Sequence, residues 1–347
     1  MVEPTSVWTS AVPLESPPAS IIGDDGVPHY GTYAGPLQTV SFDGLRHTLL
    51  RRPGWRTLHH KRWLYTLVAT PQHLCAVAVV HLGYAATAFV VVVDRRTRSM
   101  LYDRSFFTLP RFVRVEGCLE DGCDVHFRAP GARISFHRPK GSAQGTLAAD
   151  AGTLSLRATI DAAGCALPIS IVAPVPDGVV NATEKRVLMP ARGALIVGST
   201  TERFDDGIAG MDFTYGLLAR HTQWCWAMAM GKTTDGRAIA FNLVDGFNEG
   251  RECAIWLDGR MVPTESAIFT FDRDHVLSPW HLSTPDGRVD VNFEADALHA
   301  EHLNLGLIRS RFAQPFGTFS GKLSVPGQPA AVIERVPGVV ESQDVHW

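Results

Sequence analysis

The chain has 347 residues, of which 45% are hydrophobic and 19% charged, and its formal net charge at pH 7 is −3. This composition is typical of a globular protein, and the charge gives no electrostatic reason to expect nucleic acid as a partner. The length is sufficient for two domains. The longest apolar run near the middle, residues 85–93, is too short to span a bilayer, so we expect a buried strand and no stable membrane insertion.

The N-terminal residues and the cysteines predict the cellular compartment. Residues 1–25 lack the basic start and the unbroken apolar segment of a signal peptide. Six cysteines are scattered along the chain without the spacing of a zinc ribbon or a redox motif. We therefore expect a cytoplasmic protein with reduced thiols, and the sequence does not specify its oligomeric state.

Short strands separated by turns dominate the sequence after an N-terminal arm, residues 1–34, that we expect to be irregular. Short helical turns are expected only within residues 53–63 and 295–304, where Leu298, His302 and Leu305 would share a face. Elsewhere apolar and polar residues alternate, as in a sheet with one buried face. The inward-facing residues expected from this alternation are Val125, Phe127, Ile134, Phe136, Leu154, Leu156, Ile160, Val289, Val291 and Phe293.

The turns predict an all-β, antiparallel fold. Asp235, Asp258 and Asp286 each precede a glycine, which adopts a positive φ easily and closes tight hairpins. The Pro- and Gly-rich residues 172–178 are the best candidate for a domain boundary. We expect two lipocalin-like barrels, residues 35–175 and 176–347, because closing a sheet removes its exposed edges and leaves an interior that can hold one small ligand.

Residues 220–231, RHTQWCWAMAMG, combine large apolar side chains with a histidine. In a strand, Trp224, Trp226, Met228 and Met230 would share one face, and His221 would lie on the other. The large face either fills a core, which is the commoner role of such residues, or lines a cavity for an apolar ligand. The leading hypothesis supposes this cavity inside the C-terminal barrel, although the sequence does not determine which barrel holds it.

Familiar cofactor motifs are absent from the sequence. The segment GKTTDG resembles the end of a phosphate-binding loop, but Trp226 stands where that loop requires its first glycine. Ser320 in GTFSG is one position away from that of a nucleophile elbow. His299 and His302 are spaced as two metal ligands on a helix, yet no third ligand is evident. We therefore expect neither a cofactor nor a metal.

Acids and aromatic residues remain as the candidate chemistry. A carboxylic acid in an apolar barrel keeps its proton near neutral pH, and aromatic faces stabilise a developing carbocation. Such a site can protonate an alkene, with hydration, isomerisation or cyclisation to follow. In this hypothesis Asp212 or Glu252 donates the proton and His221 orients or accepts it, although a structural histidine is the commoner case. The candidate substrate-binding residues are Tyr215, Trp224, Trp226, Asn242, Trp280 and Glu341.

An ordered set of segments resembles a known family: KRWLYTLVAT, RHTQWCWA, RECAIWLDG, SPWHLSTPDGRVDVNFE, QPFGTFSG and GVVESQDVHW. Together they resemble the bacterial domain-of-unknown-function family numbered twenty-eight oh-four, over most of the chain after residue 35. Where the family pattern has an asparagine, this chain carries Cys253. The resemblance implies that the following positions recur in the family: Lys61, Arg62, Trp63, Tyr65, Gly83, Tyr84, His221, Trp224, Trp226, Glu252, Trp280, Gln314, Gly317, Gly321, Glu341 and Trp347.

A more distant resemblance is to two-barrel, lipocalin-like proteins such as carotenoid hydratases, which implies a fold more than an activity. The leading hypothesis is a cofactor-independent lyase (hydratase) or isomerase/cyclase acting on a terpenoid, fatty acyl or polyketide-like molecule. The alternative is a noncatalytic lipid or isoprenoid carrier with the same apolar cavity. A scaffold protein with fully packed barrels is a third hypothesis.

Overall fold

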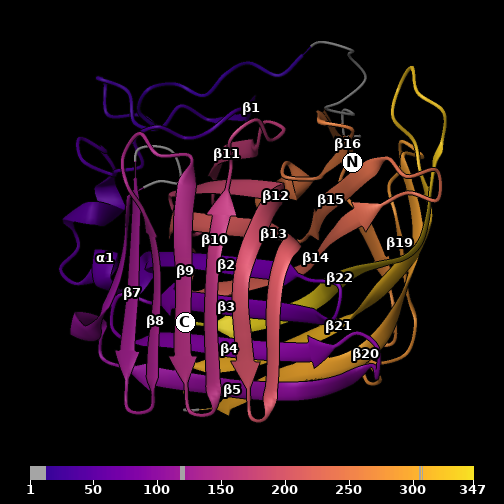
Figure 1. The fold of residues 1–347 in the computed structure, drawn as a ribbon. Coiled ribbons are helices and arrows are strands. Elements are labelled where there is room, and N and C mark those ends of the chain that lie inside the picture. Colours follow the sequence, from indigo (N-terminus) through magenta and orange to yellow (C-terminus); the bar gives the residue numbers. More distant parts are fainter. Residues whose placement is uncertain (1–12, 118–121, 305, 307) are drawn as a thin grey trace.

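The computed structural model describes residues 13–117, 122–304, 306 and 308–347. Antiparallel strands make up nearly the whole fold, which confirms the all-β prediction (Figure 1). No helix in this described part of the chain is long and apolar enough to cross a membrane. The helical segments are η1 (Thr48–Arg51), α1 (Trp55–His59), η2 (Pro110–Phe112) and η3 (Asn248–Gly250). The α1 helix lies within residues 53–63, where a helical turn was expected.

The first sheet is 13-stranded, with the main order β5-β4-β3-β2-β13-β12-β10-β9-β8-β7-β6, and β11 pairs with β1 and β12 beside this path. It curls into the first barrel. Its strands are β1 (Gly31–Ala34), β2 (His60–Ala69), β3 (His73–His81), β4 (Ala86–Asp94), β5 (Ser99–Thr108), β6 (Val113–Gly117), β7 (Cys123–Ala129), β8 (Ala132–Arg138), β9 (Gln144–Ala151), β10 (Leu154–Asp161), β11 (Ile169–Pro174), β12 (Val180–Val197) and β13 (Thr200–Leu217).

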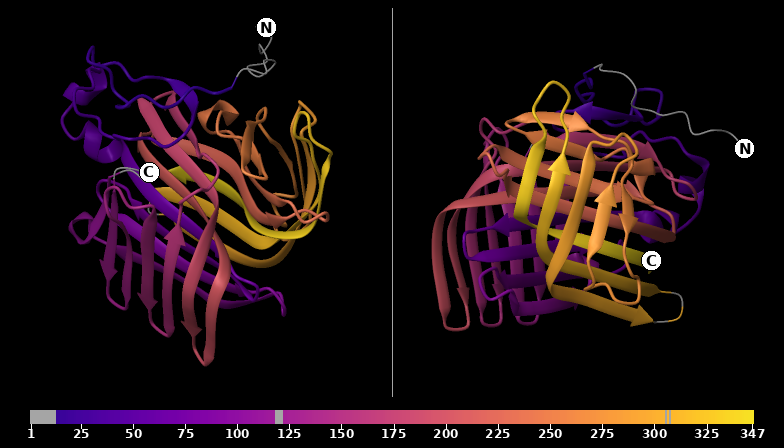
Figure 2. Two further views of the ribbon diagram at one scale, coloured as in Figure 1. Left: turned by 45° about the horizontal axis from the view of Figure 1, so that its top comes forward. Right: turned by 90° about the vertical axis from the view of Figure 1, so that its right-hand side faces the viewer.

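The second sheet is 9-stranded, with the order β17-β16-β15-β14-β22-β21-β20-β19-β18. It curls beside the first sheet, as the orange and yellow strands of Figure 2 show. Its strands are β14 (His221–Lys232), β15 (Ala238–Asp245), β16 (Ala254–Leu257), β17 (Arg260–Pro263), β18 (Ile268–Thr270), β19 (Trp280–Ser283), β20 (Val289–Asn304), β21 (Arg309–Leu323) and β22 (Ala331–His346).

The change of sheet falls later in the chain than the expected domain boundary at residues 175 and 176. That boundary lies between β11 and β12, which pair with each other in the first sheet. The residues between them form a tight turn, in which the Gly178 amide donates to the Val175 carbonyl at 3.0 Å. The Pro- and Gly-rich signal therefore marks a hairpin. The chain passes to the second sheet between β13 and β14, after Leu217 and before His221.

The N-terminal arm, expected to be irregular, contributes one short strand. β1 pairs with β11, with Gly31 opposite Val172 and Ala34 opposite Ile169. Residues 1–12 of the arm lie outside the described residues; in the part from residue 13, apolar side chains such as Ile21 are buried against the first sheet. Burial of apolar surface thus orders a segment whose sequence shows little periodicity.

Alternation and turn chemistry predict most strands correctly. The inward-facing residues expected from alternation, from Val125 to Phe293, are all buried. The glycines after the three turn aspartates have positive φ angles of 89° at Gly236, 80° at Gly259 and 68° at Gly287. The run within residues 85–93 forms the buried strand β4.

The expected helical turn within residues 295–304 is wrong, because these residues continue strand β20. The register of β20 against β21 shifts between Ala295 and Ala297, so Asp296 is the extra residue of a β-bulge. A bulge resets the alternation by one residue, and the apolar spacing then resembles that of a helix. Consequently His299 is buried whereas His302 is exposed, and Leu305 lies outside the described residues.

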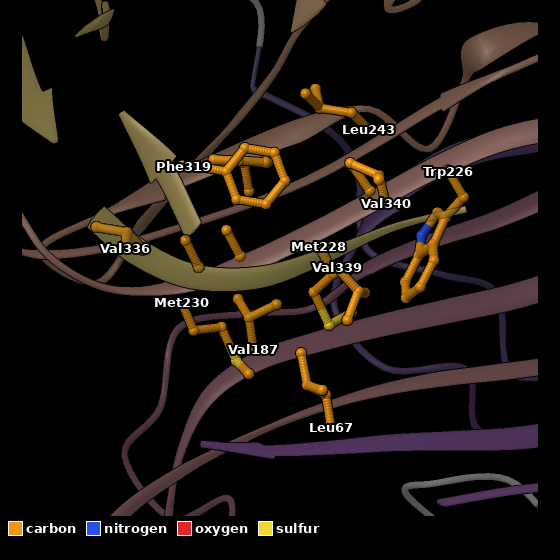
Figure 3. Packing of buried hydrophobic residues seen from close by; sticks show 14 of the residues in the cluster. Leu67, Val187, Trp226, Met228, Met230, Leu243, Phe319, Val336, Val339 and Val340 are labelled. Atoms are coloured by element: carbon orange, nitrogen blue, oxygen red, sulfur yellow. The ribbon is translucent and has the colours of Figure 1, made fainter. Parts of the chain in front are cut away.

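The two sheets share a core, and β2 contributes to both sides of it. Leu64 and Val68 point into the first barrel, whereas Leu67 packs with residues of the second sheet. Across the interface, Met228 and Met230 lie against Gly210 of β13, where an added Cβ would be 2.6 and 2.9 Å from their sulfur atoms. Figure 3 shows these methionines beside Leu67 and Val187. The large face of β14 therefore packs on the first sheet.

Candidate active site

A cavity of about 170 Å³ lies between the two sheets. Strands of the first sheet supply one wall and strands of the second supply the other, so the cavity is not inside the C-terminal barrel, where it was expected. The interior of that barrel is filled by side chains such as Phe241, Phe293 and Phe319, all fully buried. The cavity has an aromatic wall formed by Trp63, Tyr65, Tyr84, Phe89, Phe107, Trp224, Trp226, Phe247, Phe312 and Trp347.

Strand geometry brings the two walls together. In the first sheet, Tyr65, Asp212 and Lys185 lie side by side on the neighbouring strands β2, β13 and β12. In the second sheet, Trp226 lies opposite Glu341 on the neighbouring strands β14 and β22. All five residues line the cavity. Because Met228 and Met230 fill the space farther along β14, the cavity is confined to the tryptophan end of that strand.

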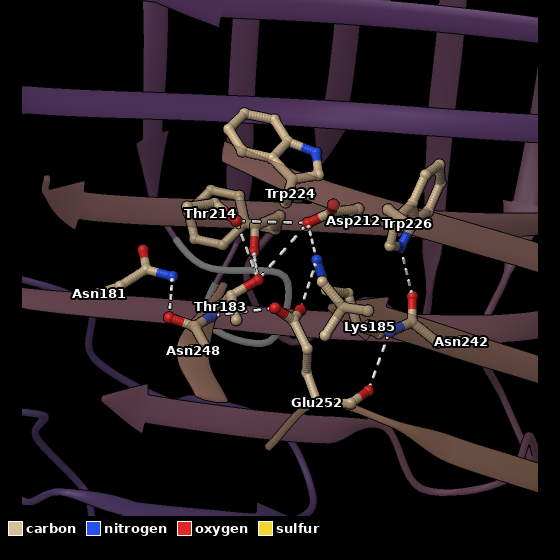
Figure 4. A network of polar contacts seen from close by, with 12 residues as sticks. Asn181, Thr183, Lys185, Asp212, Thr214, Trp224, Trp226, Asn242, Asn248 and Glu252 are labelled. Atoms are coloured by element: carbon tan, nitrogen blue, oxygen red, sulfur yellow. Dashed lines mark hydrogen bonds and ion pairs between the residues drawn. The ribbon is translucent and has the colours of Figure 1, made fainter. Parts of the chain in front are cut away.

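A buried lysine lies between two carboxylates at the base of the cavity (Figure 4). Lys185 Nζ is 2.6 Å from Asp212 Oδ1 and 2.9 Å from Glu252 Oε2. Burial opposes the charge on the lysine, but the two carboxylates outweigh burial and raise the pKa of Lys185. Burial raises the pKa of Glu252, and Lys185 counteracts part of this effect. We call Lys185, Asp212 and Glu252 the charged triad.

Neutral side chains hold the charged triad in place. Thr183 Oγ1 donates to Asp212 Oδ1 at 3.4 Å, and Asn248 Nδ2 donates to Glu252 Oε1 at 2.9 Å. The Asn242 amide donates to the Glu252 backbone carbonyl at 2.9 Å and accepts from Trp226 Nε1 at 2.8 Å. The indole of Trp226 is therefore fixed by the same network that fixes Glu252 (Figure 4).

Glu341 is a second acidic group, separate from the charged triad. Its Oε1 accepts from Trp224 Nε1 at 2.7 Å and its Oε2 accepts from Gln314 Nε2 at 2.6 Å. The side chain forms no ion pair with a described residue. Burial raises the pKa of Glu341 to about 7, although the two N–H donors favour the ionised form. The carboxyl group therefore changes protonation near neutral pH while it lies among aromatic rings.

A second buried lysine, Lys61, lies behind another part of the cavity wall. Lys61 Nζ donates to the Leu82 carbonyl at 2.8 Å and lies 4.6 Å from the ring centroid of Tyr84 and 5.3 Å from that of Trp347. Burial lowers its pKa to about 7. Leu82, Tyr84 and Trp347 all line the cavity, so Lys61 fixes three groups of its wall.

The structure brings together most of the residues that the sequence suggested. Asp212, Glu252, Trp224, Trp226 and Glu341 all line the cavity. Asn242 is fully buried behind them and bonds to two of them.

Three candidate residues lie elsewhere. His221 is exposed, bonds to Asp344 at 2.9 Å and stacks on His346, because it occupies the outward face of β14. Tyr215 packs against Phe42 and His60 and is not among the residues that line the cavity. Trp280 is buried within the second barrel and donates to the Val276 carbonyl at 2.8 Å. These positions give none of the three a contact with the cavity.

Sequence reasoning missed Lys185 and underrated Gln314 and Tyr65. Lys185 follows Glu184 and precedes Arg186, and three successive charges within a largely apolar strand are the signal that points to it. Tyr65 and Gln314 were among the positions that the family resemblance implied to recur. Tyr65 Oη donates to Gln314 Oε1 at 3.4 Å, which continues the hydrogen bonds of Glu341.

One cluster in the described part of the chain has the geometry of a metal site, and it lies outside the cavity. His221, Asp344 and His346 each offer a ligand atom within 4.8 Å of the others. The existing bond between His221 and Asp344 accounts for their proximity without an ion. No such cluster of described residues lines the cavity.

Comparison with known proteins identifies the family. The sequence profile of the domain of unknown function (DUF2804) matches residues 16–347. The chain belongs to the DUF2804 family. The resemblance seen in the sequence is thereby confirmed, and no curated protein matches this DUF2804 chain.

Solved structures share the two-barrel architecture of this DUF2804 protein. CghA aligns over 96% of this chain and 97% of its own, with a TM-score of 0.53 and 11% sequence identity. CghA with Sch210972 aligns over 94% and 97%, with a TM-score of 0.51 and 12% identity. Kievitone hydratase from Nectria haematococca aligns over 97% and 98%, with a TM-score of 0.49 and 11% identity. At these identities the likeness to CghA establishes the fold alone.

Proposed function

We propose that this protein is an enzyme that binds an apolar small molecule between its two sheets and protonates a carbon–carbon double bond with Glu341. The observation that carries the proposal is the Glu341 carboxyl group, which is buried among tryptophans and has a pKa of about 7. A general acid is most effective when its pKa lies near the working pH. The reaction needs no organic cofactor.

The surroundings of Glu341 suit the transition state of such a reaction. Proton transfer from Glu341 to one alkene carbon leaves a cation on the other carbon and a carboxylate on the enzyme. The indole faces of Trp224 and Trp226 can stabilise that cation. The charged triad contains two carboxylates and one ammonium, so its net negative charge favours a cation as well. Water addition, proton loss or ring closure then completes hydration, isomerisation or cyclisation.

The hydrogen bonds of Glu341 accommodate both of its protonation states. The ionised carboxylate accepts from Trp224 and Gln314. After protonation, rotation of the Gln314 amide presents its oxygen to the new O–H group. Gln314 therefore supports a proton cycle at Glu341. This assignment replaces Asp212 and Glu252 as proton donors, because Lys185 already binds both of those carboxylates.

A structure with the same fold supports a small-molecule ligand for this protein. CghA, which shares the architecture, has been determined with Sch210972. We further propose that the substrate is a terpenoid, fatty acyl or polyketide-like molecule, because the aromatic wall offers apolar contacts and few hydrogen-bonding groups.

The variant Glu341→Gln tests the proposal. It preserves the shape of the side chain but removes the acidic proton, so we expect kcat to fall by about 10²- to 10⁴-fold while substrate affinity is retained. The measurement is product formation by mass spectrometry across a panel of isoprenoid, fatty acyl and polyketide-like alkenes. For the wild type, activity should decline as the pH rises above about 7, because the acid is then ionised.

Glu301→Gln is the matched control, because Glu301 also lines the cavity but bonds to Ser105. It should retain full activity. Equal activity of Glu341→Gln and the wild type would overturn the assignment of the proton donor.

One observation favours the alternative, a noncatalytic carrier of lipids or isoprenoids. Both Glu341 oxygens already accept hydrogen bonds, which is how a purely structural carboxyl would be satisfied. A carrier would release its bound ligand unchanged, and Glu341→Gln would then alter neither affinity nor ligand. Mass spectrometry of ligands extracted before and after incubation separates carrier from enzyme.

A further inference from the structure

A second pocket of about 190 Å³ lies at another part of the junction between the sheets. It shares no lining residue with the aromatic cavity. The first sheet contributes the β2–β3 turn and the residues after β4, and the second sheet contributes β20, β21 and β22. The volume is several times the roughly 30 Å³ that one water molecule occupies in the liquid. We call this space the arginine pocket.

Three arginines line the arginine pocket: the adjacent Arg95 and Arg96, in the turn after β4 of the first sheet, and Arg335 from a distant part of the sequence. One carboxylate, Asp296, lines it too, but Asp296 is bound by Arg98, which does not line the pocket. The lining therefore carries more positive than negative charge. Polar groups reach this pocket from both sheets, and, unlike the aromatic cavity, none of its described lining residues is aromatic.

Irregularities in strand pairing position two of these charged residues, Asp296 and Arg335. Asp296 is the extra residue of the bulge in β20. Arg335 lies beside a second irregularity, between Phe319 and Gly321 of β21, and adopts a φ of 51° that is unusual for a residue with a side chain. Bulges redirect side chains and occur often beside functional sites. Without these irregularities, alternation would place both side chains differently.

A buried network anchors Arg95 on the other side of the pocket. Its guanidinium donates to the Thr70 carbonyl. Thr70 Oγ1 donates to Glu202 at 2.9 Å, and Glu202 in turn bonds to His73 Nδ1 at 2.6 Å. Arg95 therefore lines the pocket while one edge of its guanidinium is held by the Thr70 carbonyl.

The other two arginines have unused binding capacity. Arg335 reaches Glu294 only at 3.9 Å, in an exposed pair of the kind that contributes little. Arg96 makes no side-chain hydrogen bond or ion pair with any residue that the structure describes. Among the described residues, Arg96 therefore has no side-chain partner and Arg335 has only the long contact to Glu294.

We infer that the arginine pocket binds a small multivalent oxyanion, with a phosphoryl group as the best-fitting chemistry. Guanidinium groups bind phosphoryl oxygens through two parallel N–H donors, and three of them surround this pocket. Thr318 also lines the pocket. The inference does not depend on the reaction proposed for the aromatic cavity.

The test is calorimetric titration with inorganic pyrophosphate at constant ionic strength. The wild type should bind one equivalent, and Arg96→Ala and Arg335→Gly should each weaken binding at least tenfold. Glycine suits the positive φ at residue 335, so this variant removes the guanidinium without straining the fold. Arg96→Lys should also weaken binding, because lysine keeps the charge but lacks the paired donors.

Arg133→Ala is the control, because Arg133 is an exposed residue of β8 and its removal changes the net charge equally. It should bind pyrophosphate as the wild type does. Equal weakening by Arg133→Ala, or no saturable binding by a wild type with native circular dichroism, would overturn the inference. Binding that survives in both Arg96→Ala and Arg335→Gly would place the anion elsewhere and overturn it as well.

Discussion

Three buried acids in this protein differ because of their partners. Asp212 and Glu252 share the ammonium of Lys185, whereas Glu341 accepts from two neutral N–H donors and forms no ion pair with a described residue. A nearby positive charge offsets the desolvation of a carboxylate more effectively than neutral donors do. The pKa of Glu341 therefore rises to about 7, and it becomes the candidate acid.

The raised pKa of Glu341 predicts a pH-dependent stability. Below pH 4.5 the carboxyl is protonated in both the folded and the unfolded state; between pH 4.5 and about 7 only the unfolded chain releases the proton. The free energy of unfolding should fall as the pH rises through this window and level off above it. At about 1.36 kcal/mol per pKa unit, the loss is about 3 kcal/mol.

Glu341→Gln should lack this loss. Urea unfolding of both proteins at pH 5 and pH 8 measures the difference. If the free energy of unfolding depends on pH in the same way in both proteins, the raised pKa cannot be that of Glu341.

The charged triad predicts a large effect of losing its lysine. Lys185→Met leaves Asp212 and Glu252 buried without a counter-charge, so we expect a loss of about 3–5 kcal/mol in the free energy of unfolding. Adding Asp212→Asn and Glu252→Gln removes the uncompensated charges and should recover most of that loss. Denaturant unfolding of the single and triple variants measures this. If the triple variant is no more stable than Lys185→Met, the cost comes from packing.

Among the elements, β2, β13 and β14 decide where the cavity lies. Because both faces of β2 are buried, it serves the interior of the first barrel and the wall of the cavity at once. Gly210 in β13 allows Met228 and Met230 to approach closely. The strands are therefore in full contact at one end and separated by the cavity at the other.

Two glycines of these sheets should differ in their tolerance of alanine. At Gly210 an added Cβ meets methionine sulfur atoms, which can move, so we expect Gly210→Ala to cost about 1–3 kcal/mol. At Gly193 the added Cβ would be 1.9 Å from the Arg157 carbonyl oxygen of β10, a backbone atom that cannot move alone. Gly193→Ala should therefore be the more destabilising variant by thermal unfolding. The reverse order would show that Met228 and Met230 cannot move aside at Gly210 as this prediction assumes.

At the scale of the molecule, we expect the sheets to unfold as one cooperative unit because they share a core. Leu67 of the first sheet and Met228 of the second belong to one buried cluster. Separating the sheets would expose this cluster to water, at a cost that grows with the apolar area.

Leu67→Ala should accordingly destabilise both sheets, by about 2–5 kcal/mol. Urea unfolding followed by far-ultraviolet circular dichroism and by tryptophan fluorescence should give coincident transitions, both shifted equally by the substitution. Val125→Ala, inside the first barrel only, is the comparison and should shift both probes too. Two separate transitions would contradict a single cooperative unit.

The sequence by itself determined the antiparallel strands, their buried faces and the family, because alternation and glycine turns are local properties. It also indicated Glu341, Trp224 and Trp226 as residues of interest. Only the tertiary structure decided that the cavity lies between the sheets, that Lys185 joins Asp212 to Glu252, and that His221 faces solvent. Local patterns show which face of a strand is apolar. In β2 and over most of β14, however, both faces are buried, so only the pairing of distant strands decides which face borders the cavity.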